Sequence, residues 1–186
     1  LGLLEEEGND LALRAPWQAL VNEAGITTTA TESQGTITAI ATNGYRSIIN
    51  NTLWSRTRRL PVSGPMDPVE WQQLKAMFVN GPYYRHRFRG NELLVNPTPP
   101  AGEEWYFEYV SNNWITDSTG AQFRQYFEAD TDVTLLPETL LIAGLRWRWK
   151  KEKGFDYAED FRTYENQVAD AIGRDGGKKT LAMDNS

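Results

Sequence analysis

The chain has 186 residues, of which 40% are hydrophobic and 12% aromatic, enough apolar surface for one folded domain. Its formal net charge of −6 argues against a dedicated nucleic-acid-binding module, because such modules are usually basic. The absence of cysteine excludes disulfides and zinc–cysteine sites, and the single histidine, His86, argues against a histidine-based metal cluster. No apolar run reaches the roughly 18 residues of a membrane helix, and the first residues lack the pattern of a signal peptide.

The N-terminal segment carries small or apolar residues at helical spacing, namely Leu4, Gly8, Leu11 and Ala15. This spacing predicts a helix over residues 1–20, which Pro16 would disturb. Because the pattern is present from the first residues, we expect the chain to continue upstream of Leu1. The next segment, GITTTATE, is rich in β-branched residues and predicts a strand.

Residues 33–62 give a mixed signal, with turns at their glycines and asparagines and a strand towards their end. The segment 67–79 is predicted to be a helix. Asp67 can cap it, Pro68 suits its first position, and Glu70 completes a capping box. Its apolar face would consist of Trp71, Leu74 and Phe78.

A β-rich region is predicted over residues 83–127, with two strands joined by a turn at Gly90 and Asn91. Alternation places three arginines on one face of the first strand and Tyr84, His86 and Phe88 on the other. In the segment EWYFEYV, alternation separates Trp105, Phe107 and Tyr109 from Glu104, Tyr106 and Glu108.

Two helices are predicted to close the fold, over residues 137–151 and 156–173. Asp156 and Glu159 can form a second capping box. The apolar stripe of the last helix is Tyr157, Phe161, Tyr164, Val168 and Ile172. The sequence therefore predicts an α+β fold with one domain over residues 1–175 and an extended C-terminal arm over 176–186.

The stretch GLRWRWKKEKGFDYAEDF has two interpretations. Its lysines fall in the last turn of one helix and its acidic residues in the first turn of the next, where the helix dipoles favour them. This interpretation makes it the joint between two helices, with Trp147 and Trp149 packed inside. A basic, aromatic contact with nucleic acid or with another protein is the alternative.

Several basic residues could contact a neighbouring subunit or line a channel: Arg56, Arg58, Arg59, Arg85, Arg87, Arg89, Arg146 and Lys150. The arginines of residues 85–89 could bind a phosphate backbone, or they could pair with Glu104 and Glu108 within or between subunits. We favour the pairing.

The sequence predicts no catalytic residue, no metal site and no cofactor. It lacks the motifs G-x-S-x-G, G-x-G-x-x-G and H-E-x-x-H and the phosphate-binding loop. The acidic group of Glu128, Asp130 and Asp132 could offer oxygen ligands to calcium, but it lacks the glycine and the distal glutamate of an EF-hand. His86 alternates with aromatic residues and is better explained as a packed side chain than as a base.

Six stretches together resemble a known family. They are APWQALVNEA, LWSRTRRLPVSGP followed by EWQQLKA, RFRGNELLVNPTPPAG, FEYVSNNWITD, LIAGLRWRWKKEKGFDYAEDF and DGGKKTL. Their order and spacing resemble the head-to-tail adaptors, or connector proteins, of tailed bacteriophages. The resemblance covers almost the whole chain, although members of the family carry a further N-terminal segment.

The resemblance implies a structural virion protein and a helical bundle that carries a β-rich insertion. Such adaptors form a ring, typically of twelve copies, between the portal protein and the next neck or tail protein. They assemble in the host cytoplasm and extend a channel through which DNA passes without sequence-specific binding, and no membrane is involved. Their C-terminal segment docks on the portal, which here would involve Lys178, Lys179, Leu181 and Met183.

Three alternatives remain open from the sequence. One is a phage-associated enzyme that degrades the cell wall, since paired carboxylates suffice for glycoside hydrolysis. A second is a DNA-binding accessory protein, against which the net charge argues. A third is another virion component, such as a tail tube or fibre protein.

Overall fold

The computed structural model describes residues 1–77, 81 and 83–176, and its fold is α+β. Its contacts divide the chain into two compact units. The first, which we call the helical unit, comprises residues 1–20 together with the chain from Trp114 onwards. The second, the β unit, is Val21–Asn113 and interrupts the first in sequence. The sequence predicted a single domain over residues 1–175, and no feature of its composition marks the two points at which the chain changes unit.

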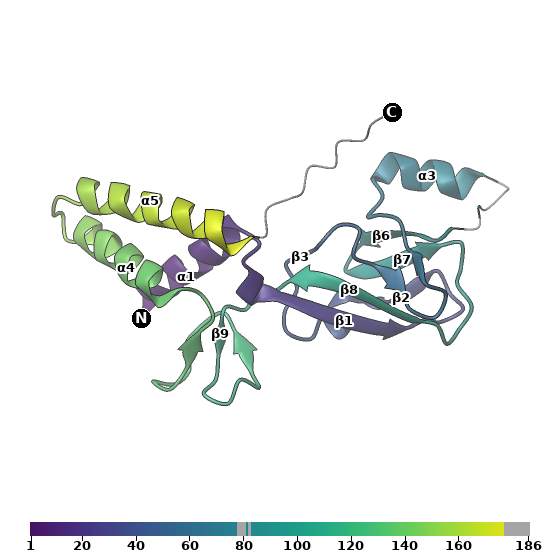
Figure 1. Ribbon diagram of the computed structural model, residues 1–186, viewed down its shortest axis with the longest axis horizontal. Coiled ribbons are helices and arrows are strands. Elements are labelled where there is room, and N and C mark those ends of the chain that lie inside the picture. The colour runs from purple at the N-terminus through teal and green to yellow at the C-terminus, as the bar shows by residue number, and fades with distance from the viewer. Residues whose placement is uncertain (78–80, 82, 177–186) are drawn as a thin grey trace. The chain divides into compact units, whose positions relative to one another are not determined.

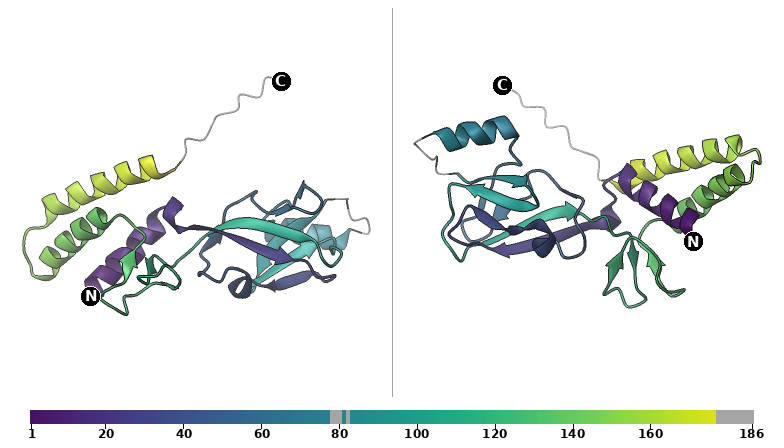
Figure 2. Two further views of the ribbon diagram at one scale, coloured as in Figure 1. Left: turned by 60° about the horizontal axis from the view of Figure 1, so that its bottom comes forward. Right: turned by 180° about the vertical axis from the view of Figure 1, so that it is seen from behind.

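Over its described residues, the helical unit contains three long helices, a short 3₁₀ helix and a small sheet. Figure 1 shows how these elements are arranged. The helices are α1 (Gly2–Arg14), α4 (Glu138–Glu152) and α5 (Ala158–Asp175), and the 3₁₀ helix is Gln18–Leu20. The sheet has the order β10 (Phe123–Arg124), β9 (Ile115–Thr116), β11 (Val133–Thr134). Helix α4 contacts both α1 and α5, and the views from other sides agree (Figure 2).

Except for the end of α1, the predicted helix ends are close to the observed ones, and the differences have local causes. Helix α1 stops at Arg14 instead of continuing to residue 20, because Pro16 excludes the helical conformation from Ala15, which is extended. Helix α5 starts two residues later than predicted. The Asp156 side chain accepts a hydrogen bond from the Ala158 amide at 3.1 Å, and Glu159 pairs with Arg162 instead of completing a capping box.

Within its described residues, the β unit holds eight strands and two helices. In chain order they are β1 (Val21–Thr27), β2 (Ser33–Thr36), α2 (Ile37–Ile40), β3 (Ser47–Ile48), β4 (Trp54–Ser55), β5 (Leu60–Pro61), α3 (Pro68–Ala76), β6 (Arg85–Arg89), β7 (Glu92–Asn96) and β8 (Glu104–Val110). Strand structure therefore begins well before the predicted β-rich region at residues 83–127. Within that region, β9 and β10 belong to the helical unit. The strand predicted for GITTTATE overlaps only the end of β1, and the one predicted towards residue 62 corresponds to β4 and β5.

Two antiparallel sheets form the β unit. In the first, β1, β8, β4 and β5 follow one another, and β3 also pairs with β8. The second has the order β2, β7, β6. Residues from both sheets share one apolar core, which includes Trp105, Phe107 and Tyr109 from β8 and Leu93 and Val95 from β7. The predicted alternation of β8 is confirmed, because these aromatic residues are buried while Glu104 and Glu108 are exposed.

The second sheet has a further apolar layer on its other face. Leu94 of β7 packs with Trp71 and Leu74 of α3. The predicted cap of this helix is confirmed, since the Asp67 side chain accepts a hydrogen bond from the Glu70 amide at 2.8 Å. The helix ends at Ala76, with Met77 extended, so it is shorter than the predicted 67–79.

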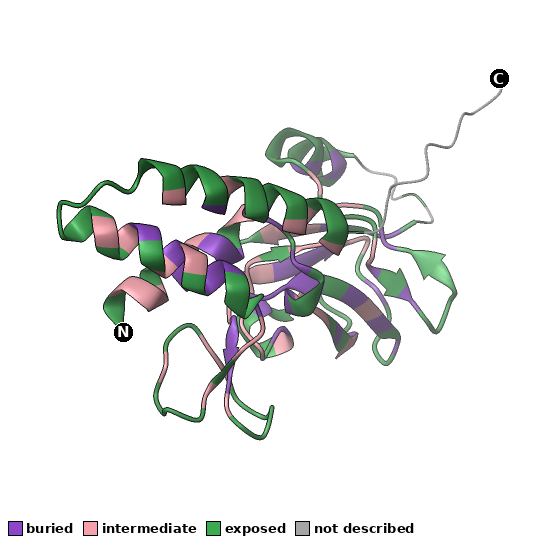
Figure 3. Cartoon of the chain, turned by 60° about the vertical axis from the view of Figure 1, so that its left-hand side comes forward, coloured by how far each residue is buried: buried purple, intermediate pink, exposed green. Residues whose placement is uncertain are grey.

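Burial separates the inner and outer faces of the elements (Figure 3). In α5, Tyr164 and Val168 are buried, whereas most of its other residues are exposed or half-buried. Within the described ranges, no helix combines the length and the apolar composition needed to span a bilayer.

Candidate interaction surfaces

The joint between α4 and α5 is built around Trp147. Its ring is buried and lies 5.0 Å from that of Phe161, 6.2 Å from that of Tyr164 and 6.3 Å from that of Tyr157, measured between ring centroids. Trp149 differs from the expectation, because it is 47% exposed, and its ring lies 5.7 Å from that of Phe155, which is also exposed. The joint thus buries one of its two tryptophans and presents the other to solvent.

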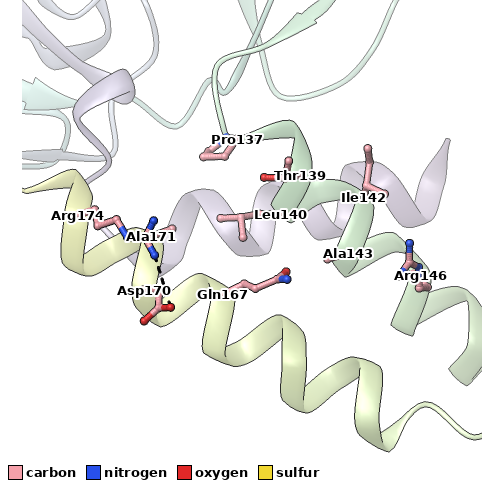
Figure 4. A pocket seen from close by; sticks show the side chains of 10 residues that line it. All are labelled: Pro137, Thr139, Leu140, Ile142, Ala143, Arg146, Gln167, Asp170, Ala171 and Arg174. Atoms are coloured by element: carbon pink, nitrogen blue, oxygen red, sulfur yellow. Dashed lines mark ion pairs between the residues drawn. The ribbon is translucent and has the colours of Figure 1, made fainter.

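Two basic residues of α4, Lys150 and Arg146, differ in whether they have an ion-pair partner. Lys150 forms an ion pair with Asp160 of α5 and so helps to join the two helices. Arg146 is exposed and has no ion-pair partner among the described residues. It borders a groove of about 430 Å³ between α4 and α5, which Figure 4 shows from close by. The groove is lined on the α4 side by Leu140, Ile142 and Ala143, and on the α5 side by Gln167, Asp170, Ala171 and Arg174.

Arg58 has a structural role inside the β unit. Its guanidinium pairs with Glu103, whose side chain is only 6% exposed. Glu103 also accepts hydrogen bonds from the Trp105 indole at 2.9 Å and from the Ser55 hydroxyl at 3.3 Å. Burial, followed by the nearby Glu103 charge, raises the pKa of Tyr84, which lies beneath the Arg58 guanidinium. Removing Arg58 would therefore leave a buried carboxylate without its counter-charge.

Arg56 is held on the outer face of the first sheet. Its guanidinium carbon lies 3.5 Å from the centre of the Tyr106 ring, and Nη2 lies 2.6 Å from Oε1 of Glu23. Tyr106 can lie flat there because Gly25 is directly opposite it in the ladder, and a side chain at Gly25 would collide with the ring. Arg59, in the turn that follows, is exposed at a φ of 59° and has no ion-pair partner among the described residues.

The arginines of β6 lie on one face, as predicted. Arg85 and Arg89 are exposed and Arg87 is half-buried, while His86 on the other face is fully buried. The favoured pairing with Glu104 and Glu108 does not occur within the chain, because β6 and β8 belong to different sheets. In the part of the chain that the structure describes, none of the three arginines has an ion-pair partner.

The acidic group around residue 130 organises a loop. Asp132 accepts hydrogen bonds from the amides of Glu128 at 2.8 Å and Ala129 at 3.1 Å, and it pairs with Arg124 at 3.3 Å. These backbone hydrogen bonds, followed by the Arg124 charge, lower the pKa of Asp132. Over the described ranges, no three histidine, aspartate or glutamate side chains are grouped to hold a metal ion.

A buried polar network joins the three long helices, and sequence reasoning missed it. Glu7 of α1 is completely buried and accepts hydrogen bonds from Nε of Arg148 on α4 and from the hydroxyl of Tyr164 on α5. Gly144 leaves room for the carboxyl group, because a Cβ there would collide with it. The sequence does contain a pattern that indicates the burial of Glu7. It is three residues from Leu4 and four from Leu11, which places it on the apolar face of the helix.

The residues predicted to dock on the portal, Lys178, Lys179, Leu181 and Met183, lie outside the described residues, as does all of the predicted arm after Gly176. No protein-family model matches this sequence, and no curated protein is significantly similar to it.

Proposed function

We propose that this protein is a head-to-tail adaptor of a tailed bacteriophage. It would form a ring beneath the portal, extend the DNA channel and offer an attachment surface to the next neck or tail protein. The observation that carries the proposal is the order of the units along the chain. A β unit interrupts a unit of three long helices, and this order agrees with the helical bundle and β-rich insertion that the sequence resemblance implies.

The distribution of charge also supports an assembling protein with a channel. A ring subunit needs two different surfaces for its two neighbours. Among the described residues of the β unit, Arg85, Arg89, Glu104 and Glu108 are exposed and form no ion pair. In the helical unit, α4 exposes Trp149 and also lines the groove shared with α5. The net charge of −6 suits a channel through which DNA must slide, because negative charge lowers the affinity for phosphate.

The test is to mix the purified chain with the portal ring of the same phage and to image the mixture by cryo-electron microscopy. We expect a second ring under the portal. Portal rings that stay bare at high concentrations of both proteins would overturn the proposal.

In the same assay, a chain that ends at Asp175 should lose portal binding if the arm with Lys178 and Leu181 docks there. A chain with the arm intact and Lys178 and Lys179 changed to alanine separates the role of charge from that of length.

A further inference from the structure

The outer face of the first sheet contains a polar hollow beside an exposed tryptophan. Its volume of about 400 Å³ falls within the range of small-molecule sites, roughly 300–1,000 Å³. The lining combines aromatic rings with carboxylate, amide and guanidinium groups, which belong to Glu23, Asn51, Trp54, Arg56, Tyr106 and Glu108. A few polar groups beside an aromatic surface are the usual components of a site for a small polar ligand.

Trp54 offers a flat apolar surface in this hollow. It is 46% exposed, and within the described ranges no other ring and no guanidinium stacks on it. Its indole Nε1–H donates to the Asn51 carbonyl at 3.2 Å, which holds the ring at one edge. Asn51 has a φ of 65°, a left-handed conformation that asparagine tolerates better than most residues. The turn before β4 therefore orients the ring before any ligand binds.

The charged groups of the hollow are only partly paired with one another. Glu23 and Glu108 lie directly opposite each other in the ladder of β1 and β8. Arg56 pairs with Glu23 and stacks on Tyr106, whereas Glu108 is exposed and has no ion-pair partner among the described residues. The Glu108 backbone is fixed, because its amide donates to the Thr52 hydroxyl at 3.1 Å. Two carboxylates and one guanidinium leave the hollow with a single net negative charge.

This set of groups suits a neutral ligand better than a charged one. The net negative charge repels phosphate and carboxylate ligands. A cation on Trp54 would lie near the Arg56 guanidinium, which occupies the Tyr106 ring and repels a second positive charge. A sugar ring is neutral, its hydroxyl groups both donate and accept hydrogen bonds, and its C–H groups present positive edges to the negative face of an aromatic ring.

We propose that this hollow binds a neutral saccharide. One sugar ring packs its C–H face on Trp54, while its hydroxyl groups donate to the Glu108 carboxylate and accept from the Arg56 guanidinium. Hydrogen bonds to charged partners are stronger than those between neutral groups, so these two residues select the ring by the placement of its hydroxyls. The β unit is then a glycan-binding module in addition to any role in assembly.

The test is saturation-transfer NMR on the full chain with neutral oligosaccharides of glucose, galactose, mannose, rhamnose and N-acetylglucosamine. We expect at least one of them to bind with a dissociation constant in the millimolar range or below and to receive most saturation at its ring C–H protons. Trp54→Ala should weaken that binding at least tenfold, because the stacking surface is lost. Trp54→Phe keeps an aromatic face and should bind more tightly than Trp54→Ala.

Matched controls change the same residue types outside the hollow. Trp149→Ala removes a tryptophan that is 47% exposed in the helical unit. Glu108→Ala should weaken binding at least threefold, and Glu104→Ala is its control, because Glu104 is an exposed carboxylate on the same strand but does not line the hollow. Neither control should change the affinity. Urea unfolding establishes that each variant is folded, so that a misfolded variant is not counted as a lost site.

Three outcomes would overturn the inference: no neutral oligosaccharide that binds at millimolar concentration, binding that Trp54→Ala leaves unchanged, or an equal loss in Trp149→Ala. Spermidine is the charged comparison ligand. If spermidine bound through Trp54 and Glu108 and no saccharide did, the hollow would be assigned to organic cations instead. Portal binding is a separate readout, since the oligosaccharide assay contains no portal, and either result can fail while the other stands.

Discussion

At the scale of the residue, His86 links the core of the β unit to pH. The ring is fully buried, and its Nδ1–H donates to the Val62 carbonyl at 3.2 Å, whereas Nε2 has no partner among the described residues. Burial lowers the pKa of His86 from 6.5 to about 4. The histidine is therefore neutral in the folded protein under conditions in which the unfolded chain already binds a proton.

We predict that the β unit loses stability as the pH falls from about 6.5 to 4. Over this window the unfolded chain binds more protons at residue 86 than the folded chain, so acid favours unfolding. A shift of this size corresponds to about 3 kcal/mol, which is fully lost below pH 4. Urea unfolding at pH 7, 5.5 and 4.5 would measure the loss.

The control is His86→Asn, which keeps a side-chain donor for the Val62 carbonyl and cannot titrate in this range. The variant starts from a lower stability at pH 7, because the amide fills less of the core than the imidazole. Its stability should then fall less steeply between pH 6.5 and 4. Parallel pH curves for the two proteins would show that other groups cause the acid sensitivity.

At the scale of the element, the buried carboxylate of Glu7 fixes how α1, α4 and α5 meet. Its side chain is 0% exposed and that of Arg148 is 12% exposed, so the pair lies in a medium where an unpaired charge is costly. Burial, followed by the hydrogen bond to Glu7, raises the pKa of Tyr164, and the protonated hydroxyl donates to the carboxylate. A polar group from each helix thus meets at one point.

We predict that Glu7→Gln lowers the free energy of unfolding of the helical unit by about 2–3 kcal/mol, because it removes the buried counter-charge of Arg148. Glu6→Gln is the matched control. Glu6 also pairs with Arg148, but it is 63% exposed, and its loss should change the stability by less than about 1 kcal/mol. Urea unfolding followed by helical circular dichroism at 222 nm compares the two. Equal losses would mean that burial does not set the strength of this pair.

The same elements show what the sequence could predict and what it could not. Alternation in β6 and β8 and the capped start of α3 are local patterns, and all three were predicted correctly. The sequence also placed three arginines on one face of β6. Which sheet that face belongs to depends on pairing between distant strands. The spacing of residues within β6 therefore could not show whether its arginines reach Glu104. The partners of Glu7 are 141 and 157 residues away along the chain, beyond any local pattern.

At the scale of the whole molecule, the chain enters and leaves the β unit at neighbouring points. Val21, at the start of β1, lies directly opposite Val110, near the end of β8, so their Cα atoms are about 5 Å apart. The β unit also has its own apolar core, to which both sheets contribute. An inserted unit with adjacent ends and a separate core has the properties of a domain that folds alone.

We predict that residues 21–113, expressed alone, unfold cooperatively on heating with the near-ultraviolet signal of packed aromatic residues. The control fragment starts at Thr29 and lacks β1. It should not fold, because β1 pairs with β8 along its full length and covers one side of the central strand. Conversely, joining Leu20 to Trp114 through a short glycine–serine linker should leave the helical unit folded, since the insert needs only a small gap between its ends. If residues 21–113 gave no cooperative transition, the β unit would depend on the helical unit for its fold.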